Sequence, residues 1–155
     1  MKLDNKWMKI ALEEANLGKE MSEVPVGAVL VDLKTNKLIS KSSNKVECKS
    51  NPLAHAELEV ILDGLNYYKK KYLKNTAIYI TLEPCLICAA AISRVKIAKI
   101  YFGAYDNKDG SIENGIRLFN NKLYFKPEIY GGIMENECSI LIKNFFRKIR
   151  KNKLI

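Results

Sequence analysis

Residues 77–91 read AIYITLEPCLICAAA, and this stretch decides how the rest of the chain is interpreted. Residues 77–81 are apolar or β-branched and predict a buried strand. Pro84 fixes φ near the value that a helix needs and suits an opening turn, so the strand should pass directly into a helix. Cys85 and Cys88 then stand one turn apart on one face of that helix, where the helix N-terminus favours thiolates.

A second stretch supplies a matching imidazole. His55, in the tripeptide His55-Ala56-Glu57, is the only histidine of the chain. Two thiolates and one imidazole are good zinc ligands but fill only three of four positions, and a position left to water distinguishes a catalytic zinc site from a structural one. Within the chain, only Cys48, Cys138 or a carboxylate could close the site. We therefore predict one catalytic zinc ion per chain on His55, Cys85 and Cys88.

Glu57 lies two residues from His55, too close for both side chains to ligate comfortably from one helix. Its carboxylate is better suited to carry a proton from water to a substrate. The pairing of H-x-E with P-C-x-x-C is typical of enzymes that deaminate nucleobases by hydrolysis. The alternative is a structural zinc knuckle, in which Glu57 is an ordinary surface acid.

The remaining elements follow from hydrophobic period and from turn residues. The first helix should be capped by Asp4 or Asn5, run to about Gly18 and place Trp7, Ala11 and Ala15 on one face. Strand, helix, strand, helix, strand after an initial hairpin predicts a three-layer α/β/α fold. The other expected strands span residues 24–31, 37–42, 99–103 and 123–129, and the other expected helical segments span about 54–67, a short stretch near Ile116 and about 135–153.

Length and cysteine usage limit the class of protein. A chain of 155 residues, 48% hydrophobic, should form a single domain over residues 1–155. It has no apolar run long enough for a membrane span, and its amphipathic start is not typical of a signal peptide, so we expect a cytoplasmic protein. In a reducing compartment Cys48 and Cys138 should be free thiols, with Cys138 buried.

The net charge of +9 is informative mainly through its distribution. The 26 basic residues include 22 lysines, a bias that an AT-rich genome can produce with many of them simply solvated. Residues 138–155 contain no acid, and a basic helix bearing Phe145 and Phe146 suits a phosphate backbone, although cations also favour any helix C-terminus. The six bases of this segment are Lys143, Arg147, Lys148, Arg150, Lys151 and Lys153. The lysines of residues 67–74 fit the solvated end of a helix.

Several further blocks resemble the bacterial tRNA-specific adenosine deaminases, of the cytidine deaminase-like superfamily, along essentially the whole chain. They are EVPVGAVLV at 23–31, AHAE at 54–57, TLEPCLICAAA at 81–91, FGAYD at 102–106, and GIMENEC and FFRKIR near the end. The resemblance implies a five-stranded mixed sheet in the order 2-1-3-4-5, flanked by helices, and a homodimer. It implies an enzyme that binds the tRNA anticodon stem-loop and converts the wobble adenosine, of an arginine tRNA, to inosine.

The same resemblance assigns further roles. Asn44 matches the asparagine that hydrogen-bonds the flipped purine, and Glu23 and Asp106 match positions lining the anticodon pocket. Phe145, Arg147 and Arg150 become candidate RNA contacts. Two departures concern substrate preference and leave the chemistry intact: Tyr105 stands where arginine is common, and Leu53 where a small polar residue is usual.

Two alternatives stay open on the residues. A small-molecule deaminase of guanine, cytosine or a nucleoside would share every zinc residue but would not need the basic C-terminal helix. An inactive zinc-bearing RNA-binding module would need neither an open coordination position nor Glu57.

Overall fold

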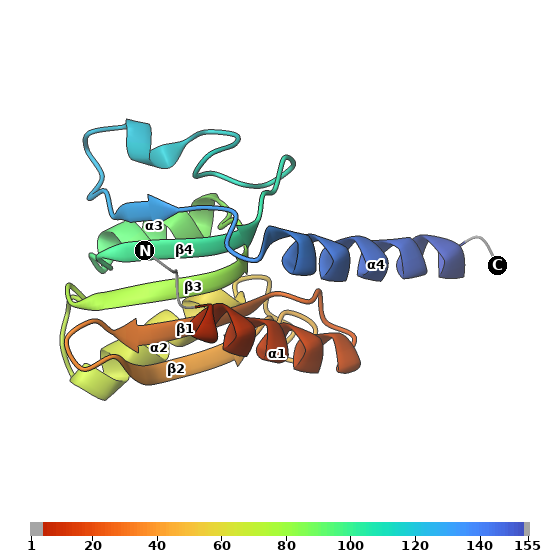
Figure 1. The fold of residues 1–155 in the computed structure, drawn as a ribbon, viewed down its shortest axis with the longest axis horizontal. Coiled ribbons are helices and arrows are strands. Elements are labelled where there is room, and N and C mark those ends of the chain that lie inside the picture. Colours follow the sequence, from red (N-terminus) through yellow and green to blue (C-terminus); the bar gives the residue numbers. More distant parts are fainter. Residues whose placement is uncertain (1–4, 154–155) are drawn as a thin grey trace.

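The computed structural model describes residues 5–153, which form a five-stranded sheet between two layers of helices (Figure 1). The strand order is β2-β1-β3-β4-β5, with β1 antiparallel to β2 and β3 and with β3, β4 and β5 parallel. This confirms the expected fold class and strand order. The elements are α1 (Lys6–Glu20), β1 (Gly27–Asp32), β2 (Lys37–Ser43), α2 (Ala56–Tyr68), β3 (Thr76–Leu82), α3 (Leu86–Arg94), β4 (Lys99–Ala104), the 3-10 turn η1 (Leu118–Asn120), β5 (Glu128–Tyr130) and α4 (Glu135–Lys153).

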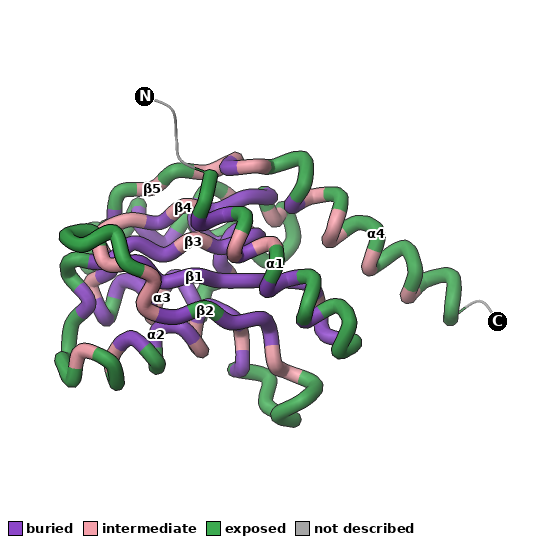
Figure 2. The backbone as a smooth tube through the Cα atoms, turned by 60° about the horizontal axis from the view of Figure 1, so that its bottom comes forward, coloured by how far each residue is buried: buried purple, intermediate pink, exposed green. Residues whose placement is uncertain are grey.

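The two faces of the sheet bury different helices. Along β1, Ala28 and Leu30 join the core formed with α2 and α3, whereas Val29 and Val31 join the core formed with α1. This alternation follows from the two-residue period of a strand, and it explains why β1 is apolar throughout. Figure 2 shows β1 as a nearly continuous buried segment in the middle of the domain.

The expected face of α1 is confirmed, since Trp7, Ala11 and Ala15 are buried. Gly27 allows this helix to come close to the sheet. A Cβ at that position would lie 1.9 Å from the carbonyl oxygen of Ala11. The backbone of α1 therefore packs directly on the start of β1.

Two strand boundaries were predicted wrongly, and proline is involved in both. β1 begins at Gly27, because the Val26 amide donates locally to Val24 and Pro25 has no amide hydrogen. β5 is only Glu128–Tyr130, since Pro127 cannot donate to a ladder and pairing with β4 starts after it. Leu123, expected inside this strand, is 89% exposed.

The ends of the helices differ from the prediction in detail. Asn5 precedes α1 but makes no side-chain capping bond, and Asp4 lies outside the described residues. Helix α1 ends at Glu20, two residues beyond Gly18. The helical stretch expected near Ile116 is the 3-10 turn that begins at Leu118. Helix α2 does end among the lysines of residues 67–74, as expected, with Lys69 in the left-handed conformation.

Helix α4 confirms the expected boundaries and projects away from the domain (Figures 1 and 2). Cys138, in its first turn, is fully buried against β4, as predicted, and is the one buried residue among those described in this helix. Beyond it the helix is half-buried or exposed. No described helix is both long and apolar enough to cross a bilayer.

Candidate active site

Two helix N-termini supply the predicted metal ligands. His55 is the N-cap residue of α2 and Cys85 the N-cap residue of α3, both with extended backbone. The sequence pattern predicts His55 and Cys85 inside their helices, whereas each stands just before the first turn. Glu57 and Cys88 occupy those first turns. Two partially positive helix ends therefore converge on this site, and they favour thiolate and carboxylate anions.

The three expected ligands lie within bonding reach of one ion. The Nδ1 atom of His55 is 3.6 Å from the Sγ atom of Cys85 and 3.4 Å from the Sγ atom of Cys88. All three ligand atoms lie within 4.8 Å of one another. With Zn–N near 2.0 Å and Zn–S near 2.3 Å, a tetrahedral ion separates imidazole and thiolate ligand atoms by about 3.6 Å. The donor set and its spacing therefore fit zinc with one coordination position left open.

The sulfur atoms differ in their readiness to lose a proton. Hydrogen bonds from Cys88 and His55 lower the pKa of the Cys85 thiol to about 4. The neighbouring Cys85 sulfur and burial raise the pKa of Cys88. The hydrogen bond to Cys85 also raises the pKa of His55. Cys88 therefore keeps its proton more readily than Cys85, and a metal ion that binds both sulfur atoms as thiolates must displace that proton.

Glu57 lies beside the ligands and is only 5% exposed. Burial raises the pKa of its carboxyl group to about 7, with the Cys85 sulfur adding to the effect. A carboxyl group near neutrality can both accept and return a proton, which is the property required of a general acid–base residue. This arrangement does not fit a structural zinc knuckle, in which Glu57 would be a solvated surface acid.

The loop between β2 and α2 brings Asn44 close to the His55 segment. The amide of Asn44 donates to Val26, and the amide of Lys45 donates to Ala54, the residue before His55. Among the described residues, the Oδ1 atom of Asn44 is the one buried side-chain oxygen or nitrogen without a hydrogen-bond partner. Such an unpaired acceptor is costly unless a ligand satisfies it.

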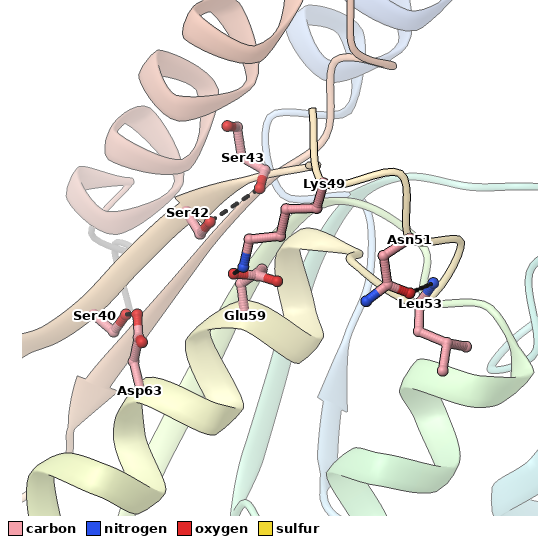
Figure 3. A network of polar contacts seen from close by, with 8 residues as sticks. All are labelled: Ser40, Ser42, Ser43, Lys49, Asn51, Leu53, Glu59 and Asp63. Carbon is pink, nitrogen blue, oxygen red and sulfur yellow. Dashed lines mark hydrogen bonds and ion pairs between the residues drawn. The ribbon is translucent and has the colours of Figure 1, made fainter. Parts of the chain in front are cut away.

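The rest of this loop is attached to α2 (Figure 3). Lys49 forms an ion pair of 2.7 Å with Glu59, and the Asn51 side chain accepts a hydrogen bond from the amide of Leu53. Leu53, one of the two departures from the family pattern, is 52% exposed at the surface next to His55. Tyr105, the other departure, is 42% exposed and is the first residue after β4.

Glu23, which the resemblance assigns to the anticodon pocket, is a buried residue that hydrogen-bonds the loop after β2. It is 1% exposed, and its Oε1 atom accepts hydrogen bonds from the amides of Glu47 and Cys48 at 2.6 and 3.2 Å. Its carboxylate therefore holds the turn after Asn44 from beneath.

Asp106 begins the loop that follows β4. Its Oδ1 atom accepts hydrogen bonds from the amides of Lys108 and Asp109, which leaves Oδ2 for a further partner. The loop packs on residues 84–88, which carry Cys85 and Cys88 and are called the zinc segment below. Cys85 and Gly110 form an isolated β-bridge, and the amide of Ser111 donates a hydrogen bond to the carbonyl oxygen of Pro84. Glu83, the buried carboxylate under this loop, is not among the residues predicted from the sequence. Its position in the sequence could have indicated it: an acid directly between an apolar strand and Pro84 is expected to be buried rather than solvated.

The predicted RNA contacts on α4 lie apart from the zinc ligands along the chain and on a projecting element (Figure 1). Phe145 is half-buried and packs edge-to-face on Phe146, with ring centroids 5.4 Å apart. Arg147 and Arg150 are exposed. The structure therefore separates a chemical site at the helix N-termini from a basic surface on α4.

The chain matches the family model described as the cytidine and deoxycytidylate deaminase zinc-binding region over residues 1–104, and it belongs to that family of zinc-binding deaminases. The tRNA-specific adenosine deaminase of Rickettsia bellii is 45% identical over 144 residues, 92% of this chain and 99% of that protein. The enzyme of the same description from Bacillus subtilis is 35% identical, covering 99% of this chain and 94% of that protein. The expected membership of the tRNA-specific adenosine deaminases is thereby confirmed.

Solved structures agree with this assignment. A structure from studies of A-to-I editing by tRNA:A34 deaminases at the wobble position of transfer RNA superimposes with a TM-score of 0.85. It is 38% identical and covers 88% of this chain and 99% of that one. A structure of the guanine deaminase from Nitrosomonas europaea superimposes with a TM-score of 0.80 over 94% of this chain and 85% of that one, at 14% identity, a likeness that concerns the fold alone.

Proposed function

We propose that this enzyme converts adenosine to inosine at the first anticodon position of a tRNA, an arginine tRNA, using one zinc ion per chain. The observation that carries the proposal is the buried carboxyl group of Glu57 beside the His55, Cys85 and Cys88 cluster, with its pKa raised to about 7. Relatives at 35–45% identity described as tRNA-specific adenosine deaminases support the choice of substrate.

His55, Cys85 and Cys88 would hold the zinc ion. When bound, zinc lowers the pKa of a coordinated water to about 7, so that a nucleophilic oxygen is available at neutral pH. Glu57 would take a proton from the attacking water and deliver it to the ring nitrogen next to C6 of the adenosine. The second proton leaves through Glu57 with the amino group, so that adenosine and water become inosine and ammonia.

Asn44 would orient the base. Its unpaired Oδ1 atom needs a donor, and an amide side chain can bond a purine edge through both of its polar atoms. An anticodon base is already single-stranded, so moving it into a pocket costs less than flipping one out of a duplex. Asp106, through its free Oδ2 atom, is the candidate for a ribose hydroxyl contact. Glu23 would contribute by supporting the loop that follows Asn44.

The basic surface of α4, with Phe145, Arg147 and Arg150, would contact the anticodon stem-loop. Exposed cations on a projecting helix can bind phosphates without constraining the chemistry. Replacing Arg147, Lys148, Arg150 and Lys151 by Ala should weaken tRNA binding and flatten its salt dependence by about 0.7–0.9 log unit per lost contact. The turnover of bound RNA should change little. Affinity measured against salt concentration checks this prediction.

A matched control is available at the opposite end of the sheet. Lys34, Lys70, Lys71 and Lys74 line an open cleft there, so their replacement by Ala removes the same charge from another surface. Equal losses in both quadruple variants would assign the affinity to net charge rather than to α4. An unchanged salt slope in the α4 variant would remove that helix from the interface.

We also propose a cytoplasmic homodimer. Leu53, Leu86 and Ile87 are 52, 39 and 50% exposed beside the zinc ligands, and a second subunit would cover apolar side chains at this place. Light scattering of the purified protein tests the assembly. Replacement of Ile87 by Asp should then release monomers.

The deciding experiment is incubation of the zinc-loaded enzyme with an arginine tRNA carrying adenosine at the wobble position, with inosine detected by sequencing. Free guanine, cytosine and nucleosides in parallel test the small-molecule alternative. Inosine at the wobble position of the tRNA, with no turnover of the free compounds, is the expected result. Ammonia release from free guanine or cytosine alone would replace this proposal with the alternative.

A further inference from the structure

We propose that Glu83 is a positioning residue whose buried carboxylate organises the loop of residues 106–114 over the zinc segment. This proposal rests on the proposed function only where KM and kcat for tRNA are measured. The hydrogen bonds between Glu83 and the loop are present in the protein without any substrate. Glu83 is neither a zinc ligand nor the proton carrier in the proposed reaction. It is nevertheless one of the most deeply buried acids of the domain, at 2% exposure.

The carboxylate of Glu83 is saturated by donors from a single loop. Its Oε1 atom accepts the amides of Ile112, Glu113 and Asn114 at 3.2, 2.8 and 3.0 Å. Its Oε2 atom accepts the amide of Asp106 at 2.9 Å and the Asn114 side chain at 2.7 Å. The three ion pairs among the described residues involve other acids, so main-chain and amide donors rather than a cation stabilise this charge.

The loop closes tightly around this carboxylate. A Cβ at Gly110 would lie 2.6 Å from both the Cδ and Oε2 atoms of Glu83, and 2.3 Å from the carbonyl oxygen of Asp106. Only glycine therefore lets the chain pass at this distance. The buried carboxylate occupies the space inside the loop that a side chain at residue 110 would need.

Glu83 also joins the loop to the chemical site. It stands two residues before Cys85 in the sequence, where β3 has ended and α3 has not begun. On the other side of the carboxylate, the loop returns to the same segment, through the Cys85–Gly110 bridge and the bond from the Ser111 amide to Pro84. One side chain thus ties Asp106, the candidate ribose contact, to the strand-to-helix turn that carries a zinc ligand.

It follows that the two buried acids of the site, Glu57 and Glu83, have different roles. Glu57 acts on the reacting atoms, and Glu83 sets where the RNA-facing loop stands. Loss of the Glu83 carboxylate should therefore weaken substrate binding more than the chemical step. A misplaced loop loses contacts to the RNA, while Glu57 and the zinc ligands stay in place on α2 and α3.

The test uses Glu83→Gln in the zinc-loaded enzyme with tRNA. In this variant the side-chain carbonyl oxygen can still accept the amides of Ile112, Glu113 and Asn114. The side-chain NH2 group then replaces the oxygen that accepts the Asp106 amide, so that two donors face each other. Because this unpairs a buried N–H group, we expect KM for tRNA to rise about tenfold or more and kcat to stay within about threefold. Zinc content should equal that of the wild type, and amide hydrogen exchange should accelerate across residues 106–114.

Glu113→Gln is the matched control, because it removes the same charge from the same loop at an exposed side chain and keeps the amide that bonds Glu83. It should leave KM, kcat and exchange unchanged. Asn114→Ala removes one of the five donors and should give a smaller increase in KM than Glu83→Gln. It keeps the test decisive should Glu83→Gln fold poorly.

Three results would overturn the proposal. Unchanged exchange of residues 106–114 in both Glu83→Gln and Asn114→Ala would show that the carboxylate does not hold the loop. A proportional loss of zinc and activity would assign Glu83 to the metal site. A fall in kcat with unchanged KM would assign it to the chemistry. If the wild type makes no inosine in any tRNA, the proposed function fails, while the exchange experiment still decides the role of Glu83.

Discussion

Glu57 and Glu83 are the same residue type, almost equally buried, and they flank the same zinc site, yet their surroundings affect their protons in opposite ways. Burial raises the pKa of Glu57 to about 7. Burial would also raise the pKa of Glu83, but the amides of Asp106, Asn114 and Glu113 and the Asn114 side chain together lower it. The protonation state of a buried acid is thus decided by the donors that face it.

This difference matches the two roles. A carboxyl group that is poorly solvated by its surroundings can exchange a proton with a substrate, so Glu57 is suited to acid–base work. A carboxylate that accepts five hydrogen bonds keeps its charge and its position. Glu83 is therefore suited to hold a loop and unsuited to carry protons.

The largest expected effect comes from removing the proton carrier. Glu57→Gln should keep zinc and fold but lower kcat by about 10²–10⁴-fold, the usual contribution of general acid–base catalysis. Single-turnover measurement of inosine formation, with zinc content measured on the same sample, checks this. If the variant kept a third of wild-type turnover, Glu57 would not be the proton carrier, and the contrast with Glu83 would lose its basis.

A smaller effect should appear in the stability of the zinc-free proteins at pH 7. Glu83→Gln leaves a buried amide hydrogen unpaired and should lower the free energy of unfolding by about 1–3 kcal/mol. Glu57→Gln removes a charge that burial disfavours and should leave stability unchanged or raise it. Urea unfolding in the presence of a chelator measures both. Equal destabilisation by the two changes would mean that both carboxylates serve the same structural purpose.

The smallest effect is the dependence of these stability differences on pH. A free Glu has a pKa of about 4.3, and the folded pKa of Glu83 lies below its ordinary value. Its stabilisation should therefore be complete above about pH 4.3 and disappear as the pH falls through the folded pKa. The gap between the zinc-free wild type and Glu83→Gln should narrow on acidification.

Glu57 should give the opposite trend in the same titration. Its folded pKa of about 7 lies above the unfolded value, so its charge costs stability only as the pH rises between them. Any advantage of Glu57→Gln should grow from about pH 4.3 to pH 7. Parallel pH profiles for both variants would contradict the assignment of different environments.

Chemistry-bearing residues were easier to predict than the chain segments between them. The candidate ligand set came from short local patterns, and the strand order came from the resemblance of the whole chain to the tRNA-specific adenosine deaminases. The boundaries of β1 and β5 were wrong because Pro25 and Pro127 act through hydrogen bonds that are missing, and a hydrophobic pattern does not report those. The family resemblance assigned Glu23 to the lining of the anticodon pocket, but the sequence did not predict that its carboxylate accepts the amides of Glu47 and Cys48, because that contact depends on where the turn after Asn44 folds back.

The sequence by itself was enough to predict the three-layer fold and the family, and to nominate His55, Cys85 and Cys88 as metal ligands and Glu57 as proton carrier. The fold follows from the order of the elements, and the nominated residues from side-chain types at short and fixed spacing. Only the tertiary structure decided which acids are buried against which donors. The Asp106 amide reaches Glu83 across 23 residues of chain, and the Asn114 amide across 31. Contacts at such separations follow from how the loop after β4 returns to the start of α3, and no local pattern around Glu83 encodes that path.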